Sequence, residues 1–165
     1  VGHQQKAEEA QVGHKEQKGG THDVKKRITT ISWIPFKVMP DMYKILERTM
    51  HQVNGNHFGY EGMQITEVAQ FTEYPKGGFY DWHMDCDINC RFEPPVRKIS
   101  MTLLLSSPNE FEGGDLEFMS EGNKPPQLLQ GQGIFFCSMI RHRVNKVKKG
   151  IRRSLVMWFG GPPFK

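Results

Sequence analysis

Residues 64–85 read QITEVAQFTEYPKGGFYDWHMD and contain two strand-like runs on either side of one turn. Both runs, Gln64 to Tyr74 and Phe79 to Asp85, include β-branched and aromatic residues that favour strands. Between them, Lys76-Gly-Gly78 is typical of a tight turn. The stretch therefore predicts two consecutive strands, and similar runs separated by Gly, Pro and Asn continue along most of the chain.

One helix is expected before this stretch. Apolar residues recur at helical spacing from Met39 to Asn54, Pro40 stands where a first helical turn tolerates it, and Asn54-Gly55 marks the end. A single helix with seven or more short strands favours a two-sheet β-sandwich or jelly roll over alternating βαβ units. Beside the two strands quoted above and one that begins at Arg27, strands are expected at residues 97–106, 115–119, 133–138, 142–147 and 152–160.

The composition is that of one soluble domain. Of 165 residues, 37% are hydrophobic and 24% are charged, enough apolar material for one core. Residues 1–26 are polar and have little to bury, so we expect a mobile arm or loop there and a single domain over residues 27–165. The longest unbroken apolar run, Leu155 to Phe159, is far shorter than the roughly 20 residues of a transmembrane helix, so no membrane association is expected.

The cysteines favour a reducing environment. Cys86, Cys90 and Cys137 are few and odd in number, which argues against a disulfide framework and for an intracellular, cytoplasmic location. No signal peptide is visible, although a chain that begins at Val1 need not include the original N-terminus. Cys86 and Cys90 lack two further zinc ligands nearby, so we interpret them as ordinary thiols.

Charge is unevenly distributed along the chain. The net charge of +4 is the sum of +2 in residues 1–28, −6 in residues 29–140 and +8 in residues 141–165. The last segment contains eight Lys/Arg and no Asp/Glu. Such a basic segment requires an anionic counterpart, which could be a nucleic-acid backbone, an acidic surface or a small anionic ligand.

A metal site is suggested by three residues. In a strand, His83 and Asp85 share one face and can share a metal ion. Beyond the arm and the helix, His142 alone among the other histidines lies in a strand-like run. Two histidines and one carboxylate form a facial triad that suits non-haem Fe(II) and leaves three coordination positions open.

An anion clamp follows ten residues after His142. Arg152 and Ser154 share one face of the last strand, whereas Arg153 points the other way and is interpreted as part of a solvated basic face. An arginine binds a carboxylate through two hydrogen bonds, and a serine hydroxyl adds a third. A carboxylate-bearing ligand next to a metal is therefore expected.

These residues resemble a known family. Tyr74-Pro-Lys-Gly-Gly-Phe-Tyr-Asp-Trp-His-Met-Asp85 and the later runs, in this order and spacing, look like the prolyl 4-hydroxylase branch of the 2-oxoglutarate and Fe(II)-dependent oxygenases. The likeness spans about residue 27 to residue 160 and implies a mainly β, double-stranded β-helix (jelly-roll) fold with one or two flanking N-terminal helices. The later runs are residues 97–106, 111–116, 133–138, 142–144 and 150–155.

The resemblance also implies an activity. It assigns Fe(II) to His83, Asp85 and His142, and the distal carboxylate of 2-oxoglutarate to Arg152, assisted by Ser154. Tyr74 matches a family tyrosine that hydrogen-bonds the cosubstrate. The implied reaction is the O2-dependent hydroxylation of an unactivated C–H bond, of a prolyl or other residue in a peptide or protein or of a small molecule. Succinate and CO2 are released, and ascorbate is the implied reductant.

Two further positions match the family, and each of them has two interpretations. Tyr80 either faces the substrate or is a half-buried strand aromatic. Arg97 either lines the substrate groove or is a surface charge. Trp158, Phe135 and Leu103 are interpreted as core or pocket wall.

Three alternative functions remain open at the level of sequence. The basic C-terminal segment favours a nucleic-acid demethylating oxygenase of the same superfamily, although Trp158 stands where that branch has a second arginine. A jelly-roll module that only binds nucleic acid or an acidic partner would need no metal. A degenerate oxygenase that acts as a sensor is the third. The arm is expected to order over the site when substrate binds, and the sequence indicates no oligomeric state.

Overall fold

Antiparallel strands form two principal sheets in the computed structural model, which describes residues 1–10, 26–86, 94–119 and 124–164. The larger sheet has seven strands: β1 (Glu8–Glu9), β3 (Thr30–Ile34), β4 (Gln64–Ile65), β5 (Ala69–Tyr74), β7 (Val96–Leu104), β10 (Gly133–Cys137) and β13 (Arg152–Gly161). The smaller sheet consists of β2 (Arg27–Ile28), β6 (Phe79–His83), β9 (Leu116–Phe118) and β11 (His142–Val144), and β8 (Phe111–Gly113) pairs with β12 (Val147–Gly150).

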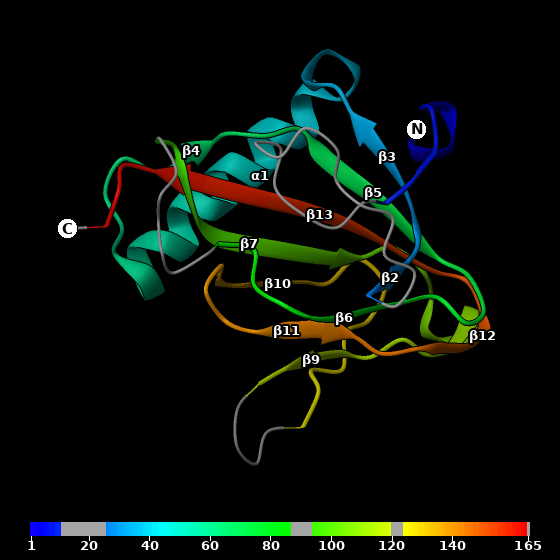
Figure 1. Ribbon diagram of the computed structural model, residues 1–165. Helices are drawn as coiled ribbons and strands as arrows, with labels where there is room; N and C mark the ends of the chain where they lie inside the picture. The colour runs from blue at the N-terminus through cyan, green and yellow to red at the C-terminus, as the bar shows by residue number, and fades with distance from the viewer. Residues whose placement is uncertain (11–25, 87–93, 120–123, 165) are drawn as a thin grey trace.

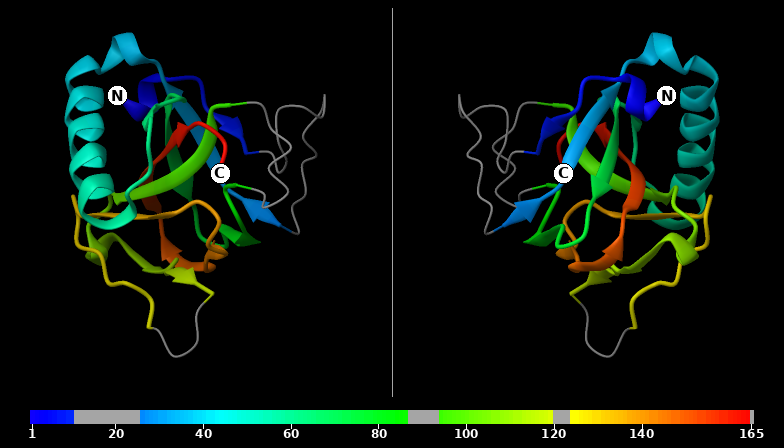
Figure 2. Two further views of the ribbon diagram at one scale, coloured as in Figure 1. Left: turned by 90° about the vertical axis from the view of Figure 1, so that its left-hand side faces the viewer. Right: turned by 90° about the vertical axis from the view of Figure 1, so that its right-hand side faces the viewer.

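The order of strands confirms the mainly β jelly-roll prediction. It is β1-β3-β5-β13-β7-β10 in the larger sheet, with β4 beside β13, and β2-β6-β11-β9 in the smaller one. Figure 1 shows the two sheets one above the other, and Figure 2 shows the main helix on the outer side of the larger sheet. No helix of the described residues is long and apolar enough to cross a membrane.

Strand β13 shows how the larger sheet separates a core from a cavity. Leu155, Met157 and Phe159 lie in the main hydrophobic core with residues of the helix, whereas Arg152, Ser154, Val156 and Trp158 line a cavity on the opposite face. The alternation follows from the two-residue period of a strand. A second, smaller core joins Tyr74 of the larger sheet to Leu116 and Val144 of the smaller one.

Helix α1 (Pro40–Val53) has the predicted position and buries Tyr43 and Met50. Its end differs from expectation, because the chain does not turn away at Asn54-Gly55 but continues through a π-helical turn, η3 (Asn54–Phe58). Asn54 is buried, and its side chain bonds both the backbone N–H and the carbonyl of Tyr60. The left-handed Gly59, at φ 71°, then ends the turn. Short 3-10 turns η1 (Gly2–Gln4), η2 (Phe36–Val38) and η4 (Pro108–Glu110) complete the helices.

Two expected strands are each divided in the structure. The run 64–74 forms β4 and β5, which pair with different parts of β13. The run 142–147 ends as β11 at Val144, because the next residues leave the smaller sheet and Val147 begins the pair with β8. Asn145 marks the change of sheet, where its N–H donates to the carbonyl of Asp115 over 2.9 Å. A partner distant in the sequence therefore decides where each strand ends.

Part of the polar N-terminal arm is packed against the larger sheet. Strand β1 pairs with β3, the Trp33 indole N–H donates to Glu8 over 2.9 Å, and His3 lies 2.9 Å from the carboxylate of Glu73. Residues 1–10 are thus docked, because the edge of β3 offers them unpaired backbone groups. Residues 11–25 lie outside the described residues, and the boundary at residue 26 stays a prediction.

Candidate functional site

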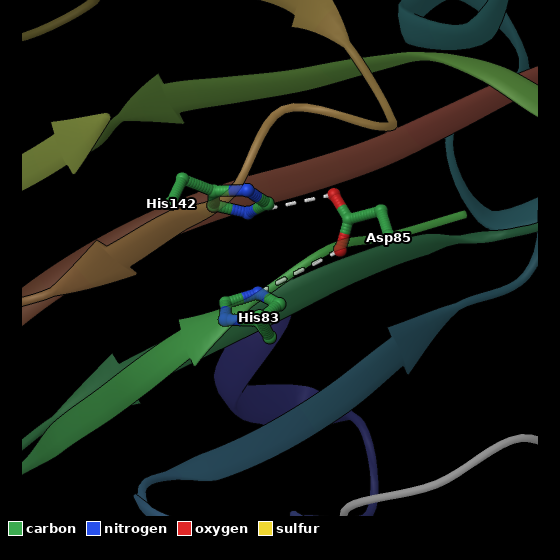
Figure 3. A group of neighbouring side chains, drawn as sticks. All are labelled: His83, Asp85 and His142. Carbon is green, nitrogen blue, oxygen red and sulfur yellow. Dashed lines mark ion pairs between the residues drawn. The ribbon is translucent and has the colours of Figure 1, made fainter. Parts of the chain in front are cut away.

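His83, Asp85 and His142 lie together at one end of the smaller sheet. His83 ends β6, His142 begins β11, and the two residues are register partners across the strands. The Asp85 carboxylate lies between them, with Oδ1 3.7 Å from His83 Nε2 and Oδ2 3.6 Å from His142 Nε2 (Figure 3). One ligand atom from each residue falls within 4.8 Å of the others, which is compatible with one bound metal ion.

The prediction that Asp85 and His83 share one face of a strand is wrong. Strand β6 ends at His83, so Asp85 belongs to the following turn and not to the strand face. The turn is held by the larger sheet, since the backbone N–H groups of Asp85 and Cys86 both donate to the carbonyl of Ser138. The Ser100 hydroxyl also donates to Asp85 Oδ2 over 2.7 Å.

Both imidazoles present Nε2 to the carboxylate. Nδ1 of His83 lies 2.8 Å from the carbonyl oxygen of Asp81, and Nδ1 of His142 lies 2.9 Å from that of Ile140. A carbonyl only accepts, so Nδ1 carries the proton and Nε2 keeps the lone pair that a metal needs. This arrangement is common for histidine ligands of metals.

The electrostatics of the group suit a divalent cation. Burial, reinforced by His142, lowers the pKa of His83 to about 4. Burial alone would raise the pKa of Asp85, but the neighbouring His142 and His83 lower it below its usual value. At neutral pH the site therefore contains a neutral His83 and a carboxylate, the forms that bind metals. Two imidazole nitrogens and one carboxylate fit Fe(II) with open positions.

A cavity of about 780 Å³ connects this group to Arg152. Arg152 is 3% exposed, its Nη1 donates to Ser154 Oγ over 3.1 Å, and its guanidinium lies 5.7 Å from the ring centre of Tyr74. Burial lowers the pKa of Arg152. Among the described residues, no carboxylate forms an ion pair with it. A buried cation without an ion-pair partner is costly, and the charge of Asp115 offsets that cost only in part, so this end of the cavity is chemically suited to an anion.

Arg153 provides the contrast that the alternation predicts. It lies on the other face of β13, where its Nε donates to Glu73 over 2.9 Å. Adjacent arginines therefore have different environments, one paired at the surface and one unpaired in the cavity.

Tyr80 lines the cavity and is also a stacked aromatic. Its ring lies 3.5 Å from that of His83 with an interplanar angle of 13°, and the Arg27 guanidinium lies 4.4 Å from the same ring. Burial raises the pKa of Tyr80 to about 12, so the phenol keeps its proton. The structure shows a largely buried strand aromatic at the cavity wall, and a substrate-facing role for Tyr80 stays a prediction.

Arg97 lines the cavity and is neutralised there. It forms two hydrogen bonds of 2.5 Å with Glu67, and its guanidinium lies 4.1 Å from the ring of Trp158. A β-bulge explains its direction, because Phe159 pairs with Ile99 and Gly160 with Arg97, which leaves Lys98 as the extra residue. Arg97 and Thr102 then line the same cavity although they are five residues apart.

Sequence reasoning did not single out Ser100, Ser138, Glu67 or Arg27. Hydroxyl residues at 100 and 102 alternate with apolar ones, which was a signal for a polar face of β7. Arg27 Nε, Thr66 Oγ1 and Trp158 Nε1 are the three buried side-chain polar atoms of the described residues without a hydrogen-bond partner, and all three residues line this cavity. Such atoms indicate where a ligand would add hydrogen bonds. Cys90 lies outside the described residues.

Comparison with known proteins indicates the family of this chain. A sequence profile of the 2OG-Fe(II) oxygenase superfamily matches residues 69–160, more than half of the chain. A PKHD-type hydroxylase of Idiomarina loihiensis is 35% identical over 99 residues, which is 58% of this chain and 44% of that protein. The chain thus spans less than half the length of that curated relative.

Solved structures share the fold. A Pseudomonas putida prolyl-4-hydroxylase matches with a TM-score of 0.66 and 22% identity over 86% of this chain and 77% of that one. A Trichoplax adhaerens prolyl hydroxylase, solved in complex with a hypoxia inducible factor peptide fragment, matches with a TM-score of 0.67 and 18% identity over 86% and 67% of the two chains. At these identities the likeness supports the jelly-roll fold alone.

Proposed function

This chain belongs to the 2OG-Fe(II) oxygenase superfamily, and from that membership we propose that it is a dioxygenase that hydroxylates an unactivated C–H bond. Fe(II), 2-oxoglutarate and O2 are the proposed cofactor and cosubstrates, with succinate and CO2 as products and ascorbate as the reductant. The proposed substrate is a prolyl or other residue of a peptide or protein.

The observation that carries this proposal is Arg152. A buried guanidinium, without an ion-pair partner among the described residues, shares one cavity with two histidines and an aspartate whose ligand atoms lie within 4.8 Å of one another. A ligand that chelates a metal at one end and carries a carboxylate at the other would satisfy both halves of the cavity. 2-Oxoglutarate has this chemistry.

In the proposed enzyme, each residue has a distinct task. His83, Asp85 and His142 would hold Fe(II), which together with 2-oxoglutarate supplies the O2-dependent oxidation of a C–H bond. Arg152 and Ser154 would bind the distal carboxylate, and Tyr74, whose ring centre lies 5.7 Å from the Arg152 guanidinium, would hydrogen-bond the cosubstrate. Anchoring that far end restricts the cosubstrate to one orientation, which supports a productive geometry at the metal.

Two further residues of the same cavity favour a peptide substrate. Arg27 and Trp158 present N–H groups without acceptors, and the carbonyl groups of a peptide chain are acceptors of the required kind. The names of the relatives, hydroxylases and prolyl hydroxylases, one of them solved with a peptide, agree with this choice. Turnover of proline-containing peptides against free proline, measured as peptide-dependent succinate release, tests it.

The reaction class is tested by anaerobic titration of the metal-free protein with Fe(II) and then 2-oxoglutarate. A chelated keto acid produces a weak visible charge-transfer band, which we expect in the wild type and not in His83→Ala. In Arg152→Ala the band should require much more 2-oxoglutarate. A flat wild-type spectrum would refute the proposal, and metal-independent, salt-sensitive binding of nucleic acid would then favour the binding-module alternative.

A further inference from the structure

We propose that Ser138 and Ser100 form a hydroxyl relay that fixes which oxygen of Asp85 is offered to the metal. The inference rests on the proposed function only in that the three-residue group holds a divalent cation. Both serines are fully buried, Ser100 in β7 and Ser138 just after β10. Ser100 Oγ lies 2.7 Å from Asp85 Oδ2 and 2.9 Å from Ser138 Oγ.

The direction of the relay follows from the number of protons. A carboxylate only accepts, so the single hydroxyl hydrogen of Ser100 is directed to Asp85 Oδ2. The contact between the two hydroxyls then needs the hydrogen of Ser138, which donates to Ser100 Oγ. Each donor in the chain polarises the next, so Oδ2 receives a stronger hydrogen bond than one serine alone would supply.

The relay distinguishes two oxygens that the histidines leave equivalent. Oδ1 and Oδ2 lie at nearly the same distance from a histidine Nε2, 3.7 and 3.6 Å. Without a further contact, the carboxylate could bind a metal through either oxygen or through both. Because Oδ2 already accepts from Ser100, Oδ1 is the favoured ligand, and monodentate binding through it preserves all three open positions of a facial triad.

Ser138 also joins the metal group to the larger sheet. Its carbonyl accepts from the N–H groups of Asp85 and Cys86, at 2.9 and 3.0 Å, and its own N–H donates to the carbonyl of Lys98 over 3.0 Å. The histidines belong to the smaller sheet, whereas the aspartate is oriented by serines of β7 and the end of β10. These serines are positioning residues, because they act on the metal through Asp85.

The test measures the affinity of the metal-free protein for Co(II) by its visible absorption, which needs no turnover. We expect Ser100→Ala to lower the affinity 10- to 100-fold, the usual effect of removing a partner of a metal ligand. Ser100→Cys, nearly isosteric but a weak donor, should lower it similarly, and Ser138→Ala should have a smaller effect. The Co(II) spectrum of Ser100→Ala should also change as Oδ2 becomes available.

Ser106 offers a matched control. It is 1% exposed, accepts from the Arg153 N–H over 2.8 Å and donates to the carbonyl of Ile151 over 3.1 Å, so Ser106→Ala removes an equally buried hydroxyl away from the metal group. We expect it to lower thermal stability without changing Co(II) affinity. Wild-type affinity in Ser100→Ala, or an equal loss in Ser106→Ala, would overturn the relay alone. A wild type that binds no divalent metal would overturn both the relay and the proposed function.

Discussion

Arg152 is a buried cation whose cost the protein offsets only in part, through Ser154 and the charge of Asp115. An unpaired buried charge costs several kcal/mol, and hydrophobic replacement of buried charges is often neutral or stabilising. We therefore expect Arg152→Met to leave the free energy of unfolding of the ligand-free protein unchanged or to raise it. Two charge-assisted hydrogen bonds are lost to the cosubstrate, so its affinity should fall at least about 100-fold. Urea unfolding and 2-oxoglutarate titration measure the two effects.

Arg153→Ala is the control for that substitution. Arg153 ends in a partly exposed ion pair with Glu73, and such pairs contribute about 0–1 kcal/mol. We expect a small loss of stability and an unchanged affinity for 2-oxoglutarate. If both variants weakened 2-oxoglutarate binding equally, the assignment of the anion site to Arg152 would be wrong.

Single residues of the site were predictable where strand alternation applies. Arg152 and Ser154 share a face because they are two apart in one continuous strand. Asp85 was predicted as a ligand because it was expected to share a strand face with His83. Its position depends instead on Ser138 and Ser100, which come from the other sheet. A contact made across the fold leaves no periodic signal in the sequence near Asp85.

Among the elements, the crowding around β12 distinguishes two glycines of similar conformation. Gly150 and Gly131 have φ values of 72° and 82°, where an L side chain costs about 1–2 kcal/mol. A Cβ at Gly150 would lie 1.9 Å from the carbonyl oxygen of Glu110, whereas one at Gly131 would meet nothing within 4 Å. We expect Gly131→Ala to cost about 1–2 kcal/mol and Gly150→Ala clearly more, because β12 must move from β8. Equal losses in urea unfolding would contradict this account.

The limits of strands were less predictable than their existence. The helix and most strands begin within about two residues of expectation, because their apolar spacing is local. The bulge at Lys98 was not predicted, although it directs Arg97 toward the cavity. It depends on β13, whose residues Phe159 and Gly160 pair with β7 more than fifty residues away.

In the whole molecule, the basic C-terminal segment meets the acidic middle of the chain. Arg143 pairs with Glu117 at 2.7 Å and Lys149 with Glu112 at 3.3 Å, while Arg153 pairs with Glu73. The +8 of residues 141–165 is thus partly compensated within the fold, and Arg152 is directed to the cavity. This pairing weakens the argument for nucleic acid that the segment's charge alone suggested.

Because the metal group draws on both sheets, metal binding should stabilise the whole fold. A ligand at 100 times its dissociation constant adds about 2.7 kcal/mol, which for a domain of this size raises Tm by about 5–10 °C. We expect such a rise with Mn(II) by circular dichroism and its reversal by EDTA. Asp85→Ala should show no rise, since it removes the ligand that the larger sheet orients. A rise of equal size in Asp85→Ala would mean that the metal binds elsewhere, because this carboxylate is one of the three ligands of the group.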